Sequence, residues 1–461
     1  MYRILIHNFE KKYLLCELIN IFLRPDQYVL EEDATQEQKE NLDLLEFNKI
    51  NTDDKDKIKR EIYQSLSEIT GEKPEWGILT GIRPVKLFGE LCAETKSSER
   101  AKEILREKYL LSESKIASIA EMYDYQVKSI GHAQRKSAGV YIGIPFCPTR
   151  CVYCSFASNQ VPDDEIERYS HALNREVEYV GRRMRETEIV AESVYIGGGT
   201  PTTFTANQLD ILLSNVRESF DFDKVKEFTV EAGRPDTITE EKLAVLKKHG
   251  VERISINPQS MKQHTLDLIG RSHKTEDIIK AFDIAKGFDF ESINADIIAG
   301  LPEEDLDDFM MTLETVEGLS ADNITVHSLA VKRASRLIDI DADFHYKQAE
   351  NVKKMTSAAE KFLKGKGYNP YYLYRQKHMA GACENVGYCH PGKEGVYNIR
   401  IMDEHQIILA LGAGGVSKMY YPDENRLERV PNVTNYCQYI ERLDEMLERK
   451  EKNIFMEVEK C

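Results

Sequence analysis

Cys147-Pro-Thr-Arg-Cys151-Val-Tyr-Cys154 follows the apolar run Gly139–Phe146, and this stretch decides most of what the chain can be. Three thiolates at this spacing can each hold one iron of a [4Fe–4S] cluster and leave the fourth iron without a protein ligand. An iron with a vacant position binds and activates another molecule, whereas a cluster held by four cysteines mainly carries electrons. The stretch therefore predicts a reactive iron–sulfur site just after a strand.

Two other uses of these cysteines fit the sequence less well. A structural zinc site needs a fourth Cys or His at a short spacing, and the downstream candidates Cys383, Cys389 and His390 lie far along the chain. A disulfide framework is disfavoured because nine cysteines is an odd number and the opening residues lack the pattern of a secretory leader. We expect a cytoplasmic location with reduced thiols, and inert buried thiols at Cys16, Cys92, Cys383, Cys389, Cys437 and Cys461.

The bulk composition is that of an ordinary enzyme. A chain of 461 residues is too long for one compact core, so two or three domains are expected. Its net charge of −16 argues against broad binding to nucleic acid or to an anionic membrane, since both need a positive surface. No apolar run is long enough to span a bilayer, so we expect no membrane anchor.

The pattern of the chain suggests three parts, bounded at 1–135, 136–335 and 336–461. The first reads as a mixed α/β module of unknown role, in which the segment from Trp76 to Lys86 predicts a shaped turn at a packed contact. The second alternates six apolar strand-like runs with amphipathic helical stretches, which predicts an α/β fold built as a partial barrel of six β/α units. The third reads as a mostly α accessory domain. The six runs are Gly139–Phe146, Ser193–Ile196, Glu227–Val230, Glu252–Ile256, Ser292–Ile298 and Asn323–Leu329.

Chemically suggestive residues fall within the fifth strand-like run or at the carboxyl ends of the other runs. Barrel enzymes build their sites at that end, because the loops after the strands converge there. In chain order these residues are the cysteine loop, Gly197–Thr202, Glu231, Asn257–Gln259, Asp296 and Ala330–Arg333.

These residues resemble a known family. The matching segments are Tyr141 to Phe156, Gly197-Gly-Gly-Thr-Pro-Thr202, Glu231, Gln259, Leu268-Ile-Gly-Arg271 and Asp296-Ile-Ile-Ala-Gly-Leu-Pro302. They resemble the radical S-adenosylmethionine enzymes of the oxygen-independent coproporphyrinogen III oxidase group, and with the long N-terminal module they look most like its HemZ-type dehydrogenases. The resemblance implies an oxidoreductase of haem biosynthesis. It would decarboxylate two propionates of coproporphyrinogen III to vinyls and yield protoporphyrinogen IX.

The resemblance also implies the cofactors and the residues that hold them. The cluster would be bound by Cys147, Cys151 and Cys154, and its open iron would chelate S-adenosylmethionine, of which one or two molecules are expected. Tyr141 and Arg271 are the expected catalytic residues, and Tyr153 borders a second S-adenosylmethionine in the family. The expected cofactor contacts are Tyr141, Tyr153, Gly198, Gly199, Thr200, Glu231, Gln259, Arg271, Asp296 and Ala330.

A tetrapyrrole with four propionates needs cations, and the chain offers candidates in the loops after its strands. The expected partners are this substrate and an electron donor such as flavodoxin or ferredoxin, with the protein acting as a monomer. The candidate cations are Lys332, Arg333, Arg336, Arg150 and Arg234.

The match has departures that leave alternatives open. Gly143 stands where the best-studied oxidases carry a histidine, and Phe156 stands where they carry a further cysteine. Related haem chaperones carry His-Asn-x-x-Tyr-Trp where this chain has Glu384-Asn385-Val-Gly-Tyr388-Cys389, which argues against a chaperone. A haem-binding carrier and another radical enzyme of tetrapyrroles, for methyl transfer or anaerobic ring opening, are the alternatives. His378, Cys383, Cys389 and His390 are the candidate haem ligands, and Tyr371–His378 and Leu411–Lys418 are candidates for covering the site.

Overall fold

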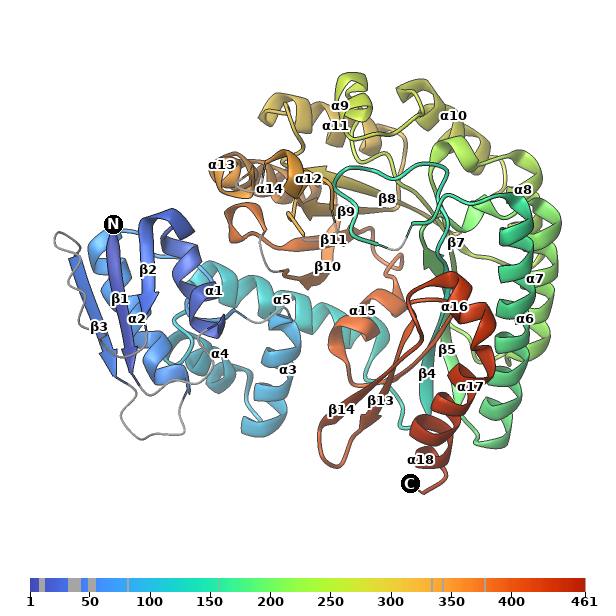
Figure 1. Ribbon diagram of the computed structural model, residues 1–461, viewed down its shortest axis with the longest axis horizontal. Coiled ribbons are helices and arrows are strands. Elements are labelled where there is room, and N and C mark those ends of the chain that lie inside the picture. The colour runs from blue at the N-terminus through green and yellow to red at the C-terminus, as the bar shows by residue number, and fades with distance from the viewer. Residues whose placement is uncertain are drawn as a thin grey trace.

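The computed structural model describes residues 1–7, 13–31, 43–48, 55–80, 83–156, 158–332, 335–341, 344–376 and 379–460. These residues form a small three-stranded sheet near the N-terminus and a second sheet of eleven strands (Figure 1). Arg333, His378 and Cys461, which the sequence analysis singled out, lie outside the described residues.

Six parallel strands form the middle of the large sheet, and they lie side by side in chain order. They coincide with the six apolar runs of the sequence, so the α/β architecture is confirmed. The strands are β4 (Ser137–Ile144), β5 (Val190–Gly198), β6 (Glu227–Gly233), β7 (Arg253–Ile256), β8 (Ser292–Ala299) and β9 (Asn323–Ser328). The helices between them are α6 (Asp163–Glu186), α7 (Ala206–Ser219), α8 (Glu240–Lys248), α9 (Gln263–Leu268), α10 (Thr275–Lys286) and α11 (Leu306–Gly318).

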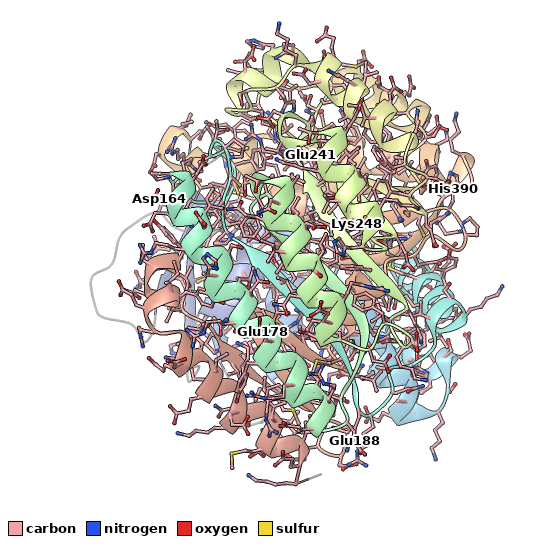
Figure 2. The ribbon with its side chains drawn as sticks, turned by 90° about the vertical axis from the view of Figure 1, so that its right-hand side faces the viewer. Asp164, Glu178, Glu188, Glu241, Lys248 and His390 are labelled. Atoms are coloured by element: carbon pink, nitrogen blue, oxygen red, sulfur yellow. The ribbon has the colours of Figure 1, made fainter. Side chains whose placement is uncertain are left out.

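Helix α6 shows why these connections are helical and why they cover the sheet. Its apolar residues recur every three or four positions, and Tyr169, Leu173 and Val177 are fully buried. Acidic residues begin the helix and arginines end it, which complements the helix dipole. Figure 2 shows Asp164 and Glu178 on the outer side of this helix, with Lys248 of α8 in the same layer. The helices thus form an outer layer whose exposed face is charged.

The region from 336 to 461 adds strands to both sides of the six parallel ones. β11 (Asn385–Cys389) pairs antiparallel with β9, and β10 (Asn369–Tyr374) pairs with β11. On the opposite side β12 (Ile407–Leu411) runs parallel to β4, followed by the antiparallel strands β13 (Val416–Tyr421) and β14 (Arg426–Pro431). The sheet is therefore open, with β10 and β14 at its edges. The helices of this region are α12 (Leu337–Ile340), α13 (Phe344–Lys347), α14 (Ala349–Gly365), α15 (Val396–Asp403), α16 (Tyr436–Glu441), α17 (Leu443–Lys450) and α18 (Met456–Val458).

The N-terminal region divides between two hydrophobic cores. The parallel strands β1 (Tyr2–His7), β2 (Tyr28–Glu31) and β3 (Asp43–Asn48) pack with helices α1 (Tyr13–Phe22) and α2 (Lys55–Thr70) around a core of their own. Helices α3 (Pro84–Thr95), α4 (Ser98–Glu107) and α5 (Glu113–Ile130) instead share the core of the large sheet. This region therefore combines strands and helices, and its second half packs on the large sheet.

Trp76 makes a packed contact with the C-terminal region. Its indole N–H donates to the Glu384 carboxylate at 3.1 Å, and the Lys115 and Arg375 cations lie 5.3 and 4.8 Å from its ring centre. This agrees with the interpretation of the segment as a packed contact, for the residues of it that are described. Among the described residues no helix combines the length and the apolar character needed to cross a membrane.

Candidate functional site

All of the predicted cluster ligands and cofactor contacts border one cavity of about 370 Å³. The cavity lies at the carboxyl ends of the parallel strands, since Gly198 ends β5, Ser328 ends β9 and the cysteine loop follows β4. Residues separated by almost two hundred positions in the chain thus meet because parallel strands bring their ends to the same edge. The structure places the predicted residues together, although their individual roles stay predictions.

The cysteine loop is held in place by backbone hydrogen bonds to two other segments. The Cys147 N–H donates to the Asn159 carbonyl at 3.1 Å, and the Val152 N–H donates to the Ile269 carbonyl at 3.0 Å. The Cys147 thiol also lies 3.4 Å from the Thr200 hydroxyl. The loop is therefore anchored at its start and its middle, which sets the positions from which the three thiols face the cavity.

The donor set of the three cysteines fits a cluster better than a single ion. Within the described part of the chain, no three Cys, His, Asp or Glu side chains are placed to hold one metal ion. Cys147, Cys151 and Cys154 nevertheless border the same cavity, and all three are free thiols. A [4Fe–4S] cluster takes one thiolate per iron, so its ligands are spread around a larger group.

Gly198 and Gly199 are required by their neighbours in the fold. Gly198 adopts a φ of +121°, and a Cβ there would lie 2.8 Å from the Ile144 carbonyl oxygen. A Cβ on Gly199 would lie 2.5 Å from the Phe146 carbonyl oxygen and 3.0 Å from the Cys147 sulfur. The bare backbone of the glycine triplet thus lets the end of β5 pass directly against the start of the cysteine loop.

Glu231 and Asp296 are two carboxyl groups of the cavity wall whose pKa values are shifted in opposite directions. Burial raises the pKa of Glu231 to about 7, in spite of a 2.7 Å hydrogen bond that the Tyr195 hydroxyl donates to it. Burial also disfavours the Asp296 anion, but His327 and the Asn294 amide, which donates at 2.9 Å, outweigh burial and lower the pKa of Asp296. The site therefore holds one carboxylate that is ionised at neutral pH and one that a ligand's hydrogen bonds can ionise.

Several buried polar atoms of the cavity-lining residues have no hydrogen-bond partner among the described residues, including Ser255 Oγ, Asn257 Oδ1, Gln259 Oε1 and Arg271 Nε. Gln259 is also a non-glycine residue with a φ of +66°, which is unfavourable unless the surroundings impose it. Its backbone N–H donates to the Asp296 carbonyl at 3.0 Å, so it is tied to β8. Buried polar atoms without partners are rare in folded proteins, and a polar ligand with amine, carboxylate and hydroxyl groups would satisfy these.

Arg271 lies against the cysteine loop, close to Tyr153 and Cys151 of that loop. Arg271 is 7% exposed, and its guanidinium donates to the Asn257 carbonyl at 2.5 Å. Burial lowers the pKa of Arg271, but Tyr153 and Cys151 beside it raise the pKa by a larger amount, so the guanidinium stays charged.

Ala330 follows β9 and forms an isolated antiparallel bridge with Met379.

Tyrosines form a large part of the cavity wall, and sequence reasoning found only some of them. Two wall tyrosines, Tyr141 and Tyr195, stack at 6.2 Å, and Tyr195 also stacks at 4.7 Å on Tyr397 of α15, which is not among the residues that border the cavity. Tyr372 and Tyr374 of β10 stack on each other at 6.3 Å with nearly parallel rings. Tyr195 carries a usable signal, because it lies two residues before the glycine triplet in the same strand. Tyr372 and Tyr374 belong to the segment Tyr371–His378 that the sequence suggested as a cover, and they reach the cavity through the long-range pairing of β10 with β11. Other wall residues that the sequence did not indicate are His327, Asn385, Asn398 and Met402.

The candidate substrate cations separate into distinct groups. Lys332 borders the cavity, and burial lowers its pKa; no described acidic side chain pairs with it. Arg234 also borders the cavity, but its guanidinium is engaged with Asp236, Thr149 and Ser272. Arg150 and Arg336 are not part of the cavity wall. Lys332 is therefore the candidate best placed to meet an anionic substrate.

The candidate haem ligands that the structure describes lie in different surroundings. Cys383 borders a second cavity of about 790 Å³, which lies between the N-terminal region and the C-terminal helices. Cys389 packs in a separate cluster with Tyr371, and the His390 ring lies 3.9 Å from that of Tyr368. These described residues thus provide no common pair of axial ligands.

The fold and the cysteine loop define a radical S-adenosylmethionine protein, and the pattern of the Radical SAM superfamily matches residues 141–316. The chain belongs to the family of the oxygen-independent coproporphyrinogen-III oxidase-like protein HemZ of Bacillus subtilis, to which it is 40% identical over 397 residues. That match covers 85% of this chain and 79% of the relative. Membership of this superfamily implies a [4Fe–4S] cluster and S-adenosylmethionine as cofactors.

Two further proteins are similar to parts of this chain. The haem chaperone HemW of Bacillus subtilis is 34% identical over 193 residues, which cover 42% of this chain and 50% of the chaperone. The structure of coproporphyrinogen III oxidase (HemN) from Escherichia coli, described as a radical SAM enzyme, matches with a TM-score of 0.53 and 22% identity. It covers 71% of this chain and 73% of that chain, and it confirms the fold.

Proposed function

We propose that this protein is an oxygen-independent coproporphyrinogen III dehydrogenase that acts in the cytoplasm. The observation that carries the proposal is the single cavity in which the cysteine loop, the unpartnered polar atoms and Lys332 face one another. Such a site brings a cluster, a polar cofactor and an anionic substrate within reach of each other. The 40% identity to the HemZ protein supports the same class of substrate.

The chemistry would divide between the cofactors and the chain. When bound, the cluster would pass one electron, from a donor such as flavodoxin or ferredoxin, to S-adenosylmethionine and cleave its sulfonium bond. The carbon radical released by this cleavage would abstract the hydrogen atom. Loss of a hydrogen atom from the propionate, departure of CO₂ and transfer of one electron to an acceptor together leave a vinyl group. The chain's own residues must therefore hold a propionate in place and keep water away from it.

Lys332 and the tyrosine wall can perform these two tasks. Because burial lowers the pKa of Lys332, a propionate beside it would restore the favourable charged state and form a strong ion pair. The Tyr372 and Tyr374 rings, stacked with an interplanar angle of 4°, offer flat apolar surface for pyrrole rings. Phe156, which is 66% exposed, lies beside Lys332 with its ring 5.8 Å from the ammonium group. Together they provide a cation flanked by aromatic surface at the cavity.

The surroundings of Glu384 and Asn385 favour an enzyme over a haem carrier. Glu384 occupies the position of the chaperones' histidine, and it binds the Trp76 indole N–H and pairs with Lys115. The Asn385 side chain accepts a hydrogen bond from the Ser328 N–H at 2.8 Å. This segment therefore serves internal packing in the described structure, which leaves no haem-binding histidine at that position.

The test is anaerobic incubation of the reconstituted, reduced protein with S-adenosylmethionine and coproporphyrinogen III, followed by mass analysis. Mono- and di-decarboxylated products that accumulate with matching 5′-deoxyadenosine are expected, and the Cys151→Ala variant should produce neither. Formation of 5′-deoxyadenosine without decarboxylation would rule out this substrate and make haem the next one to test. Binding of haem with no turnover of either compound would favour the carrier.

A further inference from the structure

Strand β6 carries a bulge immediately after the predicted cofactor contact Glu231. The parallel pairing of β6 with β7 shifts register between Glu231 and Gly233, and Gly233 adopts a φ of +66°. A bulge of this kind bends the strand and redirects the residues that follow it. Its consequence here is that Arg234, which follows Gly233 directly, is turned inward and is only 4% exposed.

Arg234 links two loops of the site that are far apart in the chain. Its guanidinium donates at 2.6 Å to the Thr149 hydroxyl, which lies between Cys147 and Cys151 in the cysteine loop. It donates at 3.0 Å to the Ser272 hydroxyl, which is next to Arg271. The two Asp236 carboxylate oxygens accept from its Nε and Nη2 at 2.9 and 2.8 Å and fix its orientation. All three guanidinium nitrogens are therefore engaged inside the protein.

The two loops also contact each other directly, and Ser272 makes a further bond to Asp236. The Thr149 hydroxyl donates to the Gly270 carbonyl at 3.0 Å, and the Ser272 hydroxyl donates to Asp236 at 3.1 Å. The Val152 N–H bonds the Ile269 carbonyl. A planar guanidinium held by a bidentate carboxylate is a rigid connector, because its donors have a fixed fork geometry. The buried Arg234 guanidinium and its Asp236 partner thus add to these direct contacts in setting the distance between the cysteine loop and the Arg271 loop.

We propose that Arg234 and Asp236 are positioning residues that lock the cysteine loop against the Arg271 loop, and so fix the cluster thiols relative to the arginine expected to contact the cofactor. This role replaces the contact to a substrate propionate that the sequence suggested for Arg234. The inference rests on the cluster and S-adenosylmethionine that the family implies, and it does not depend on which substrate is used.

The first test measures thiol reactivity in the protein without its cluster. Thr149→Val removes the hydroxyl that accepts from Arg234 and donates to Gly270, so Cys147 and Cys151 should be alkylated about tenfold faster, as expected for the loss of two hydrogen bonds. Thr149→Ser keeps the hydroxyl and should react at the wild-type rate. Cys92 on α3 is the internal control, and its rate should not change. Equal rates in all three proteins, or equal acceleration at Cys92, would overturn the proposal.

The second test separates the two loops in the reconstituted protein. Ser272→Ala breaks only the connection to the Arg271 loop, so it should weaken binding of S-adenosylmethionine several-fold while the cluster is lost under air at the wild-type rate. Thr149→Val should instead speed cluster loss. Arg234→Lys cannot bind Asp236, Thr149 and Ser272 together, so it should show both defects and an altered electron paramagnetic resonance signal after cofactor addition. If Ser272→Ala and Thr149→Val changed cofactor binding and cluster loss to the same extent, Arg234 would not connect two separately acting loops, and the proposal would be wrong.

Discussion

Replacement of Glu231 by glutamine should stabilise the protein without its cofactors and weaken cofactor binding. Burial raises the pKa of Glu231 from about 4.5 to about 7, and a shift of this size corresponds to about 3 kcal/mol of unfolding free energy. Because the pKa is higher in the folded state, the cost of the carboxylate is absent below pH 4.5, grows up to pH 7 and is constant above it. At pH 8 the buried carboxylate of Glu231 therefore lowers the unfolding free energy of the wild-type protein by the full amount of about 3 kcal/mol.

The glutamine side chain has the same shape as that of Glu231 and no charge to desolvate, but it would accept a weaker hydrogen bond from Tyr195. The pKa of about 7 already includes the bond from Tyr195 to the carboxylate, so the neutral glutamine should gain about 3 kcal/mol at pH 8 and none at pH 4.5. Urea unfolding of the apoprotein at the two pH values, followed by circular dichroism, measures this difference. Binding of S-adenosylmethionine to the reconstituted variant should be weaker, since the ionised carboxylate is the form that pairs with polar groups of the ligand.

The control for this experiment is Glu227→Gln, on the same strand. The Glu227 carboxylate accepts from the Thr229 hydroxyl at 2.9 Å and from the backbone N–H of Tyr397 at 3.3 Å, so its replacement should destabilise the protein. If Glu231→Gln were destabilising to the same extent at both pH values, the carboxylate would be a structural group like Glu227. The reasoning from burial to function at Glu231 would then be wrong.

Three further changes test other parts of the structure. Lys450→Met leaves the fully buried Glu176 carboxylate without the ammonium group 2.7 Å away, which should cost about 3–5 kcal/mol in urea unfolding; adding Glu176→Gln should recover part of this loss. Gly199→Ala places a Cβ 2.5 Å from the Phe146 carbonyl oxygen, so iron bound per chain after reconstitution should fall, whereas Gly318→Ala, with no atom within 4 Å, should bind iron normally. Lys332→Gln should raise the KM for the tetrapyrrole about tenfold with little change in cluster content. The control Lys361→Gln, at an exposed position of α14 that does not border the cavity, should not change the KM.

The site could be predicted to a large extent because its residues sit at fixed places in a repeating pattern. Each β/α unit ends its strand at the same edge of the sheet, so a polar residue after an apolar run is already placed near the others. Glu231, which follows the third run, obeys this rule, and it borders the cavity together with Asp296, which lies within the fifth run. Arg234 does not, because the bulge at Gly233 turns it inward, and nothing in the apolar pattern marks a one-residue insertion in the strand.

The C-terminal strands show a different reason why sequence reasoning stops short. Ile407-Ile-Leu-Ala-Leu411 is a continuous apolar run, as expected for a strand buried on both faces, but a short run of this kind does not reveal its partner. In the structure it pairs with β4, more than 250 residues earlier in the chain, and so extends the sheet beside the strand that leads to the cysteine loop. The turn after it, which the sequence suggested as a cover, has its Gly412 N–H bound at 2.7 Å by the buried Glu176. Since Lys450 of α17 neutralises Glu176, the last helices stabilise the strand on which the cysteine loop depends. The stability of the cluster site should therefore respond to changes in the C-terminal helices α16, α17 and α18, although none of their residues borders the cavity.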